Sequence, residues 1–502
     1  MLESLVWVAI WGAALAGAAR QGQASETQPA VQGKRPNILF IYTDDQSWRT
    51  LSCYNGRPWV RTPNIDRLAA EGVRFTCAYG AAWCTPSRAC VMTGLLPHAI
   101  RGLQIEGVFK GSYDPAVCRF WPAELRKAGY RTTLIGKWHL GPDSGHGRDW
   151  DHSIVWNQAD IRGDWYNDQL LSIDGAPKTV VPGYSTDVYT QFAVEEIKRQ
   201  HDKPWFMWLC YNAPHLPLTV HPRHKERYVN VEVPIPSDVF GPRPGKPQYM
   251  QAFTMWKRDQ DNPEGPPIHG RQTLPEFVRA YNRLVCALDD GVGRILAALA
   301  ETGQLDNTLI VYTSDQGFAI GEHGFAWKVG PYEACMRMPL ILRLPGQVAK
   351  GGVCPQPVGL VDLPPTFFAL AGLPLPWAMN GHDLQPLLRN PQADWDHPIL
   401  LENFRWRFGS ETDRGLTGDD LMGGVPWWIA IWKGHYKYVR TLVPNEIEEL
   451  YDFQQDPDEK HNLALESDRR PLLTDYRERM LAELTRTNAG LVKNLPTPRT
   501  GQ

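Results

Sequence analysis

The stretch Asn-Ile-Leu-Phe-Ile-Tyr-Thr-Asp-Asp, residues 37–45, joins a short apolar run to two acidic residues. A continuous apolar run of this length suits a strand that is buried on both faces, as in a parallel sheet covered by helices. Similar runs recur at residues 132–135, 205–211, 309–312 and 340–344. Helical patterns lie between them, at residues 65–71, 122–128 and 277–299. Alternating strands and helices predict an α/β fold with a large, mainly parallel sheet flanked by helices.

Two segments interrupt this alternation and are longer than ordinary connections, residues 141–184 and 221–272. Long segments of this kind often shape the site of an enzyme. A Pro-rich stretch then indicates a boundary that extends to residue 394. Beyond it, a hairpin around Lys433-Gly434 and a late helix at 468–487 predict a smaller C-terminal α+β subdomain. We therefore assign residues 35–385 to a catalytic domain and residues 395–490 to this subdomain.

The N-terminus carries one apolar run, residues 5–19, followed by small and polar residues. This run is too short for a comfortable transmembrane helix, and no second long apolar run follows. We predict a signal peptide at residues 1–24, a secreted or periplasmic protein, and no integral membrane segment after cleavage. The alternative is an uncleaved anchor, because no Lys or Arg precedes the run.

The charge of the 502-residue chain is nearly balanced, with 52 basic and 55 acidic residues. This balance gives no general attraction for nucleic acid or for an anionic membrane, so we expect no nucleic-acid partner. An anionic substrate must instead be bound by a local cluster of positive groups. The nine cysteines lack the close spacing of a zinc or redox site, and eight could pair if one is chemically consumed.

Polar residues follow the apolar runs at the points where strands are predicted to end. They are Asp44, Asp45, Lys137, His139, His215, Asp315 and Gln316. In open α/β sheets, ligands bind at the carboxyl ends of the strands, so these side chains are expected at one edge. Asp44, Asp45, Asp315 and Gln316 offer oxygen ligands only, which favours Ca²⁺ or Mg²⁺. The alternative is that each acidic pair is a solvated turn.

Residues 84–88 read Cys-Thr-Pro-Ser-Arg. Pro86 is well placed to open a helix that ends before Gly94. Cys84 would then lie at a helix N-terminus, where partial positive charge favours an anion. Arg88, one turn later, could hold an anionic group in a fixed geometry. The alternative is a reactive or merely structural cysteine.

These motifs resemble the formylglycine-dependent type I sulfatases of the alkaline-phosphatase-like superfamily. The Cys-x-Pro-Ser-Arg signature at 84–88 is the most specific match, and matches in the family's order span about residues 35–465. The further motifs lie at 44–45, 63–66, 136–141, 213–215, 314–315, 321–324, 328 and 449–452.

The resemblance implies an enzyme that hydrolyses sulfuric esters. It implies oxidation of Cys84 to formylglycine by a formylglycine-generating enzyme, and a Ca²⁺ ion held by Asp44, Asp45, residue 84, Asp315 and Gln316. Many family members carry Asn or His where this chain has Gln316, which makes Gln316 the least secure ligand.

The resemblance also implies the roles of the remaining site residues. Formylglycine at position 84 would attack sulfur, and Arg88 would steady it. Lys137 and Lys328 would bind the sulfate oxygens. His215 would protonate the departing alcohol, and His139 would take the proton when sulfate is expelled.

Two other readings stay open. A phosphate- or phosphonate-ester hydrolase of the same superfamily would share the metal site and the nucleophile. A catalytically silent carbohydrate-binding protein would have lost a motif residue, and none of the core ones is missing. We expect a sulfated carbohydrate, or another sulfate ester, as substrate. Four tryptophans are candidates to line a sugar site, with core packing as the alternative: Trp150, Trp156, Trp165 and Trp406.

Overall fold

The computed structural model describes residues 34–106, 110–157, 164–199, 202–416 and 420–499. The predicted signal peptide at residues 1–24 lies outside these ranges. Within them, no helix has the length and apolar character needed to cross a membrane.

The main element is an eleven-stranded sheet with the order β16-β2-β15-β12-β1-β9-β5-β6-β7-β8, and β17 pairs with β2. Its centre consists of parallel neighbours, as the apolar runs predict. These strands are β12 (Thr308–Ser314), β1 (Asn37–Thr43), β9 (Trp205–Cys210) and β5 (Arg131–Lys137). Because all four run in one direction, their carboxyl ends meet at one edge of the sheet.

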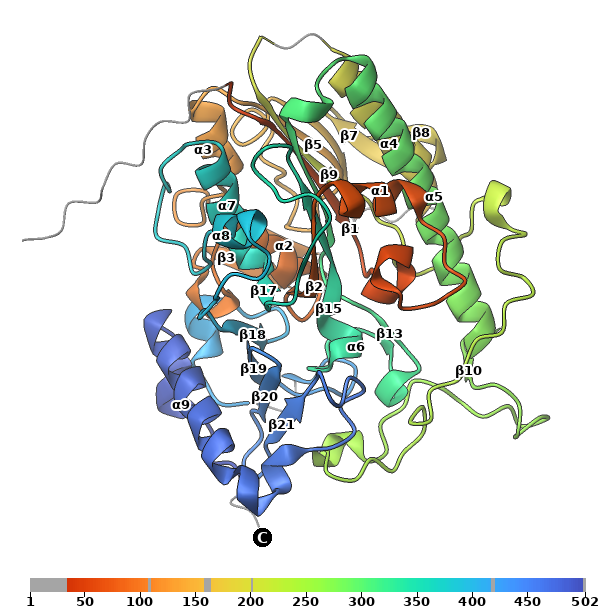
Figure 1. Ribbon diagram of the computed structural model, residues 1–502, viewed down its shortest axis with the longest axis vertical. Helices are drawn as coiled ribbons and strands as arrows, with labels where there is room; N and C mark the ends of the chain where they lie inside the picture. The colour runs from red at the N-terminus through yellow and green to blue at the C-terminus, as the bar shows by residue number, and fades with distance from the viewer. Residues whose placement is uncertain (1–33, 107–109, 158–163, 200–201, 417–419, 500–502) are drawn as a thin grey trace, which may run out of the picture. The chain divides into compact units, whose positions relative to one another are not determined.

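Helices cover both faces of this sheet (Figure 1). Leu39 and Ile41 of β1 share a buried cluster with residues of one helix layer, while Ile38, Phe40 and Tyr42 share another cluster with the opposite layer. The first layer contains α1 (Pro63–Glu71), α4 (Ser185–Lys198) and α5 (Leu274–Glu301). The second contains α2 (Cys84–Thr93), α3 (Pro122–Lys127), α7 (Leu363–Leu370) and α8 (Gln385–Arg389).

Among the outer strands, the sequence analysis predicted only β15, through the apolar run at residues 340–344, and missed the others. On one side, β15 (Arg337–Arg343) runs antiparallel to β12 and to β2 (Val73–Tyr79), which also pairs with β16 (Gly352–Cys354) and β17 (Val358–Gly359). On the other side lie β6 (His152–Trp156), β7 (Asn167–Ile173) and β8 (Thr179–Tyr184). The interrupting segment at 141–184 therefore extends the sheet.

Short elements complete the large domain. The second interrupting segment, 221–272, contains 3-10 turns at Pro222–His224 and Gln248–Met250. The paired short strands are β10 (Ile268–His269) with β11 (Gln272–Thr273), β13 (Ala319–Ile320) with β14 (Ala326–Trp327), and β3 (Leu103–Glu106) with β4 (Lys110–Tyr113). The short helix α6 spans Glu333–Met336.

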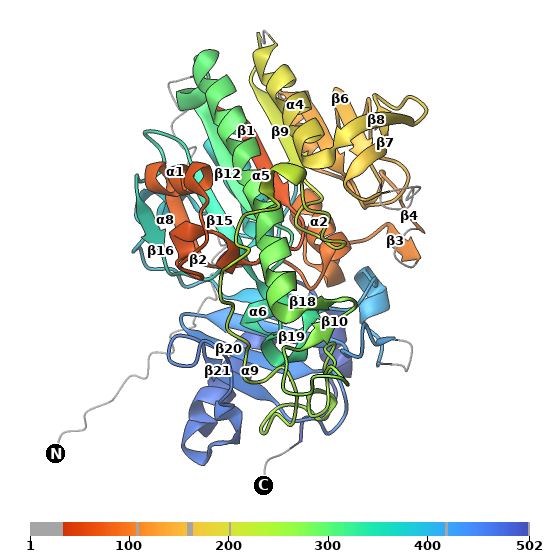
Figure 2. The ribbon, with the colours of Figure 1, turned by 90° about the vertical axis from the view of Figure 1, so that its right-hand side faces the viewer.

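The C-terminal part forms a four-stranded antiparallel sheet with α9 (Arg470–Arg486) beside it (Figure 2). Its strands are β18 (Ile399–Asn403), β19 (Trp428–Lys433), β20 (Tyr436–Thr441) and β21 (Glu449–Asp452). Side chains along β19 alternate between two clusters. Ile429 and Ile431 pack with α9, whereas Trp428 and Trp432 belong to the core of the large domain. This sheet is therefore held from both faces.

All nine cysteines lie in the described ranges, and none forms a disulfide. The possibility that eight of them pair is not realised. Every cysteine except Cys53 is buried, so these side chains act as small apolar residues of the core.

Candidate active site at the carboxyl edge of the sheet

The strand ends deliver polar side chains to one buried cluster. Asp44 and Asp45 follow β1, Asp315 and Gln316 follow β12, and Lys137 is the last residue of β5. Asp45 adopts a left-handed conformation with φ of 61°, so the chain has left strand geometry where the two carboxylates meet. Both Asp44 and Asp45 contact the Cys84 thiol, as expected only if β1 ends before them.

Cys84 is the first residue of α2 and is 1% exposed. Its Sγ lies 3.2 Å from Asp44 Oδ1, 3.7 Å from Asp45 Oδ1 and 2.9 Å from Lys328 Nζ. Arg88, one helical turn later, donates from Nη1 to the carbonyl of Lys137 at 2.7 Å. The N-terminus of α2 therefore places a thiol among carboxylates and lysines.

Two lysines pair with the two adjacent carboxylates. Lys137 Nζ contacts Asp44 Oδ2, and Lys328 Nζ lies 2.5 Å and 2.7 Å from the two carboxylate oxygens of Asp45. Both lysines are buried. Burial alone would lower the pKa of Lys328, but Asp45, Cys84 and Asp44 raise it above its usual value, so the side chain is cationic.

Asp315 has one satisfied and one unsatisfied carboxylate oxygen. Its Oδ1 accepts hydrogen bonds from the amides of Asp45 at 2.8 Å and Gln316 at 3.0 Å, whereas its buried Oδ2 accepts none. The Nη2 of Arg88 is 3.9 Å from that Oδ2. The Gln316 carboxamide reaches Asp45 with Nε2, and a half turn would present its oxygen there instead. An unpartnered buried oxygen beside further oxygen donors fits a hard cation.

Ligand atoms of four residues lie within 4.8 Å of one another: Asp44, Asp45, Cys84 and His215. This group could hold a metal ion. His215 was predicted as a catalytic residue and not as a ligand, and it lies with its Nε2 3.5 Å from Asp45 Oδ2.

Burial and the charges of neighbouring groups raise some pKa values in this cluster and lower others. Burial, and then the charges of Asp315 and Asp44, raise the pKa of the Cys84 thiol well above its usual value. Burial and the charges of Asp44 and Asp45 also raise the pKa of Asp315. Burial would raise the pKa of Asp44 too, but Lys137, His215 and Arg88 hold it well below its usual range. The thiol therefore stays protonated, although a helix N-terminus alone would favour a thiolate.

His215 is held by a stacked tryptophan. Its ring lies parallel to that of Trp165, with centroids 4.7 Å apart, and its Nδ1 is 2.5 Å from the Leu216 carbonyl. This contact leaves Nε2 facing Asp45. Burial, together with the charges of Lys328 and Lys137, lowers the pKa of His215 to about 4 against the opposing effect of Asp45. In the protein without substrate, the imidazole is therefore neutral near pH 7.

His139 follows the same strand as Lys137, but it lies beside Trp83, the residue before Cys84. Its buried ring meets the ring of Trp83 edge-on, with centroids 6.2 Å apart. The other nine predicted site residues are linked to one another by the contacts above.

This cluster coincides with a family match. The family model described as sulfatase matches residues 36–373, which include every predicted site residue. The chain belongs to the sulfatase family. A second model, described as the C-terminal part of N-sulphoglucosamine sulphohydrolase, matches residues 321–486 of this sulfatase.

Individual relatives agree with this assignment. The sulfatase is 30% identical to the N-acetylglucosamine-6-O-sulfatase of Bacteroides thetaiotaomicron, over 86% of this chain and 83% of that protein. It resembles the solved structure of BT4656 with its substrate D-glucosamine-2-N,6-O-disulfate, with TM-score 0.76 and 28% identity, over 91% of this chain and 98% of that one. A phosphonate monoester hydrolase of Agrobacterium radiobacter shares the fold, with TM-score 0.65 and 22% identity, over 90% of this chain and 96% of that one.

The four tryptophans proposed for a sugar site have different surroundings in the sulfatase. Trp150 is fully buried and stacks on Trp208, and Trp156 is 3% exposed. For these two residues the structure favours the alternative of core packing. Trp165 lies at the site against His215, and Trp406 is partly exposed under the guanidinium of Arg405.

Tyr281, within the predicted helix 277–299, was not identified as a site residue from the sequence. Its hydroxyl donates to the Asp45 carbonyl and accepts from the amide of Ser47 at 2.9 Å. It thereby fixes the turn that carries Asp45. A tyrosine on the apolar face of a helix is predicted to pack in the core. Only the tertiary structure shows this contact.

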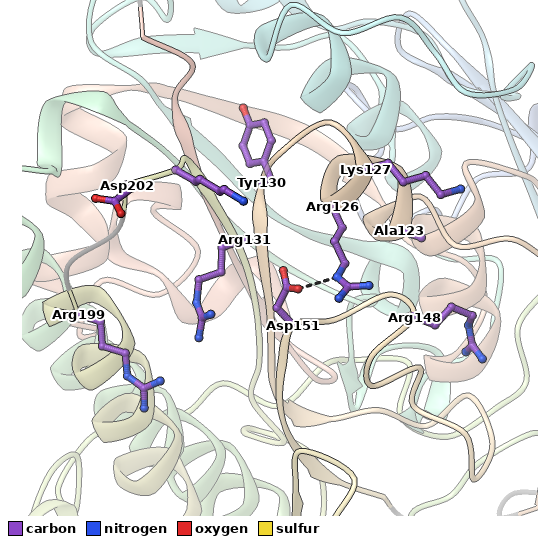
Figure 3. Close-up of a pocket in the computed structure, with 10 residues that line it drawn as sticks. Ala123, Arg126, Lys127, Tyr130, Arg131, Arg148, Asp151, Arg199 and Asp202 are labelled. Carbon is purple, nitrogen blue, oxygen red and sulfur yellow. Dashed lines mark hydrogen bonds and ion pairs between the residues drawn. The ribbon is translucent and has the colours of Figure 1, made fainter.

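A cavity of about 710 Å³ has a lining that contains none of the predicted site residues. Figure 3 shows the residues that line it. Its lining includes Arg131, the first residue of β5, and Lys203, which precedes β9, so it opens at the amino ends of these strands. Its basic residues are largely paired, for example Arg126 with Asp151 at 2.6 Å and Arg131 with Glu196 at 2.7 Å. Because none of the predicted site residues lines it, this cavity is a weaker candidate for the substrate than the Cys84 cluster.

Proposed function

We propose that this sulfatase uses formylglycine at position 84 and a Ca²⁺ ion to remove sulfate from a sulfated sugar. The observation that carries the proposal is the position of Cys84, at the start of α2 and in contact with Asp44, Asp45 and Lys328. A nucleophile for a sulfate ester needs cationic groups beside it, and this site supplies them.

The donor set supports calcium. Asp44, Asp45, Asp315 and Gln316 would hold the ion, and the unpartnered Oδ2 of Asp315 would gain a partner. A bound Ca²⁺ would supply positive charge next to residue 84 and the sulfate oxygens. Oxygen donors of this kind favour a hard cation over zinc.

The surroundings of residue 84 favour a modified side chain over the thiol. A thiol with a raised pKa is a weak nucleophile, because the thiolate is the reactive form. Hydrated formylglycine supplies a hydroxyl that can attack sulfur and a second hydroxyl that allows sulfate to leave. A formylglycine-generating enzyme would be the partner that forms it.

The chain's own residues would then bind and orient the ester. Lys137 and Lys328 would bind sulfate oxygens, and Arg88 would hold the segment that carries Lys137 through its carbonyl. His215 would need the negative charge of bound substrate to take up a proton before donating it to the leaving oxygen, because its pKa is about 4 in the free protein. His139 would accept the proton of the second hydroxyl.

A sulfated amino sugar is the first substrate to test. The relatives named for N-acetylglucosamine-6-O-sulfate hydrolysis and for a glucosamine disulfate complex support this choice. Trp165 offers an aromatic face beside His215. We also propose export of the protein, on the strength of the apolar run at residues 5–19.

Sulfate release from 6-O-sulfated N-acetylglucosamine, simple aryl sulfates and matched phosphate and phosphonate esters tests the proposal. The protein must come from a host that makes formylglycine, and a residue-84 peptide about 18 Da below the thiol form verifies conversion. We expect release from the sulfated sugar, with little turnover of the phosphorus esters.

Two variants serve as controls. Cys84→Ala should abolish turnover, whereas Cys90→Ala, in the same helix but outside the cluster, should retain it. Turnover of phosphate or phosphonate esters without sulfate release would favour the other hydrolase of this fold. Multiple turnovers by Cys84→Ala would exclude residue 84 as the nucleophile.

A further inference from the structure

Lys328 is carried by a short segment between β14 and α6. Its ammonium group contacts both Cys84 and Asp45, and the side chain is 3% exposed. The backbone of residues 329–332 must therefore be fixed if the ammonium is to stay at the nucleophile.

The residue that follows Lys328 has a strained backbone. Val329 adopts φ of 71°, a left-handed conformation that is unfavourable for a β-branched side chain. Its amide donates to the carbonyl of Ala82 at 3.1 Å, two residues before Cys84. Such a conformation persists only when surrounding contacts impose it.

The C-terminal subdomain supplies those contacts. The indole Nε1 of Trp428, in β19, donates to the Val329 carbonyl at 2.8 Å. The ammonium of Lys437, in β20, donates to the Pro331 carbonyl at 2.7 Å. The hydroxyl of Tyr332 donates to Glu449 Oε2 of β21 at 3.1 Å. Three adjacent strands thus hold three residues of the segment behind Lys328, which are Val329, Pro331 and Tyr332.

We infer that Trp428 is a positioning residue for Lys328, and that the C-terminal subdomain holds part of the catalytic geometry through it. Trp428 does not contact Cys84 or the carboxylates in any hydrogen bond of the described residues; it acts on Val329, and Val329 is bonded to the segment of the nucleophile. The inference rests on the proposed role of Lys328 in binding sulfate.

A pair of neighbouring tryptophans allows a matched test. Trp428→Phe removes the indole N–H that holds Val329. Trp427→Phe removes the same atoms from the adjacent residue, which is 1% exposed, packs in the α9 cluster and makes no hydrogen bond through Nε1. Both variants lose similar buried apolar surface, so a general loss of packing affects both.

Two measurements separate positioning from stability. We expect kcat/KM for sulfate release to fall by about tenfold to a hundredfold in Trp428→Phe and to change little in Trp427→Phe, because small displacements of catalytic groups are costly. Hydrogen exchange of a peptide containing the Val329 amide should speed up in Trp428→Phe alone, since that amide loses local protection. The thermal midpoints of the two variants should be similar.

Equal exchange rates at Val329 in both variants, with equal activities, would overturn the inference. If Trp428→Phe does not fold, benzothienylalanine at position 428 keeps the ring volume and removes only the N–H donor, and the same comparison applies. Exchange does not depend on turnover. If the proposed function fails, wild type releases no sulfate, but the exchange result still reports whether Trp428 holds Val329.

Discussion

At the scale of single residues, the site is a balance of buried charges. Asp44, Asp45 and Asp315 face the cationic groups of Arg88, Lys137 and Lys328 within a region closed to solvent. In such surroundings each charge depends on its partner, since an unpaired buried charge is strongly unfavourable. Asp315 has the least complete set of partners, because its Oδ2 accepts no hydrogen bond.

Asp315→Asn should therefore remove bound calcium while leaving the shape of the site nearly unchanged. We expect calcium per chain, measured by elemental analysis after gel filtration, to fall by about tenfold or more, because ligand charge sets affinity in oxygen sites. Gln316→Ala should cause a smaller loss.

A matched control for this prediction is Asp289→Asn. Asp289 is also buried, but it accepts hydrogen bonds from the amides of Asn64 and Ile65, which lie outside the cluster. Its substitution should leave calcium content unchanged. Full calcium content in Asp315→Asn and in Gln316→Ala would remove both residues from the predicted metal site.

Most residues of this candidate site could be predicted because they stand in short motifs at a predicted strand end or helix start, whereas Lys328 was predicted from the family resemblance alone. Which of the four tryptophans lie at the site could not be predicted. Trp150 and Trp165 carry the same side chain in the same interrupting segment, yet one is fully buried against Trp208 and the other stacks on His215. The difference depends on long-range packing, which no local pattern records.

At the scale of elements, the ends of the strands, and not their middles, place the side chains of the candidate site. Gly136, the last residue but one of β5, has φ of 101°, and a Cβ there would overlap the carbonyl oxygen of Cys210 in β9. This positive φ lies within the strand, directly before Lys137. The approach of two strands, and the placement of the lysine that we propose binds sulfate, therefore depend on one residue without a side chain.

Gly136→Ala should destabilise the protein and reduce its activity. We expect a loss of about 2 kcal/mol or more in the free energy of unfolding, measured in urea, from strain plus displaced backbone. Gly129→Ala is the control, because Gly129 has φ of 94° but no atom within 4 Å of an added Cβ. It should show the cost of strain alone; equal costs for both variants would contradict the role of the close contact.

The central strands were predicted nearly to the residue, while β6, β7 and β8 were not. β1 and β12 are buried at every position and read as continuous apolar runs. β7 and β8 carry exposed and polar residues, such as Asp168 and Thr179, because one side of this edge faces solvent. An edge strand lacks the apolar signal that double burial imposes.

At the scale of the whole molecule, a buried ion pair joins the segment after α2 to the C-terminal sheet. His98, after α2, places Nδ1 2.5 Å from Glu402 Oε1 of β18 and Nε2 3.1 Å from the Thr487 carbonyl. Both side chains of the pair are inaccessible to solvent. Burial alone would lower the pKa of His98, but Glu402 raises it above its usual value.

This pair predicts a pH-dependent stability. Because the folded-state pKa of His98 is raised, its contribution is complete below the unfolded value of about 6.5 and is lost as pH rises through the folded value. The thermal midpoint of wild type, relative to the double variant His98→Gln/Glu402→Gln, should be highest near about pH 6 and fall towards about pH 9. The double variant keeps a hydrogen-bonded pair without titratable groups. A constant difference across this range would show that His98 does not titrate in the folded protein.

The C-terminal subdomain itself was predicted, but its attachment to the catalytic domain was not. The hairpin around Lys433-Gly434 and the late helix both exist, as β19, β20 and α9. The two faces of β19 look equally apolar in the sequence, so the sequence does not indicate that one face packs against α9 and the other against the catalytic core.

The contact between Trp428 and Val329 also bears on when residue 84 can be modified during synthesis. A ribosome making about 5–20 residues per second needs roughly 20–70 s for the approximately 340 residues between Cys84 and Trp428. Throughout that interval the nascent chain lacks Trp428 and its contact with Val329. We therefore expect Cys84, almost fully buried in the finished protein, to be accessible to the modifying enzyme we propose. Ribosome-stalled chains that end before residue 428 should be converted at residue 84. The refolded, complete chain should resist conversion.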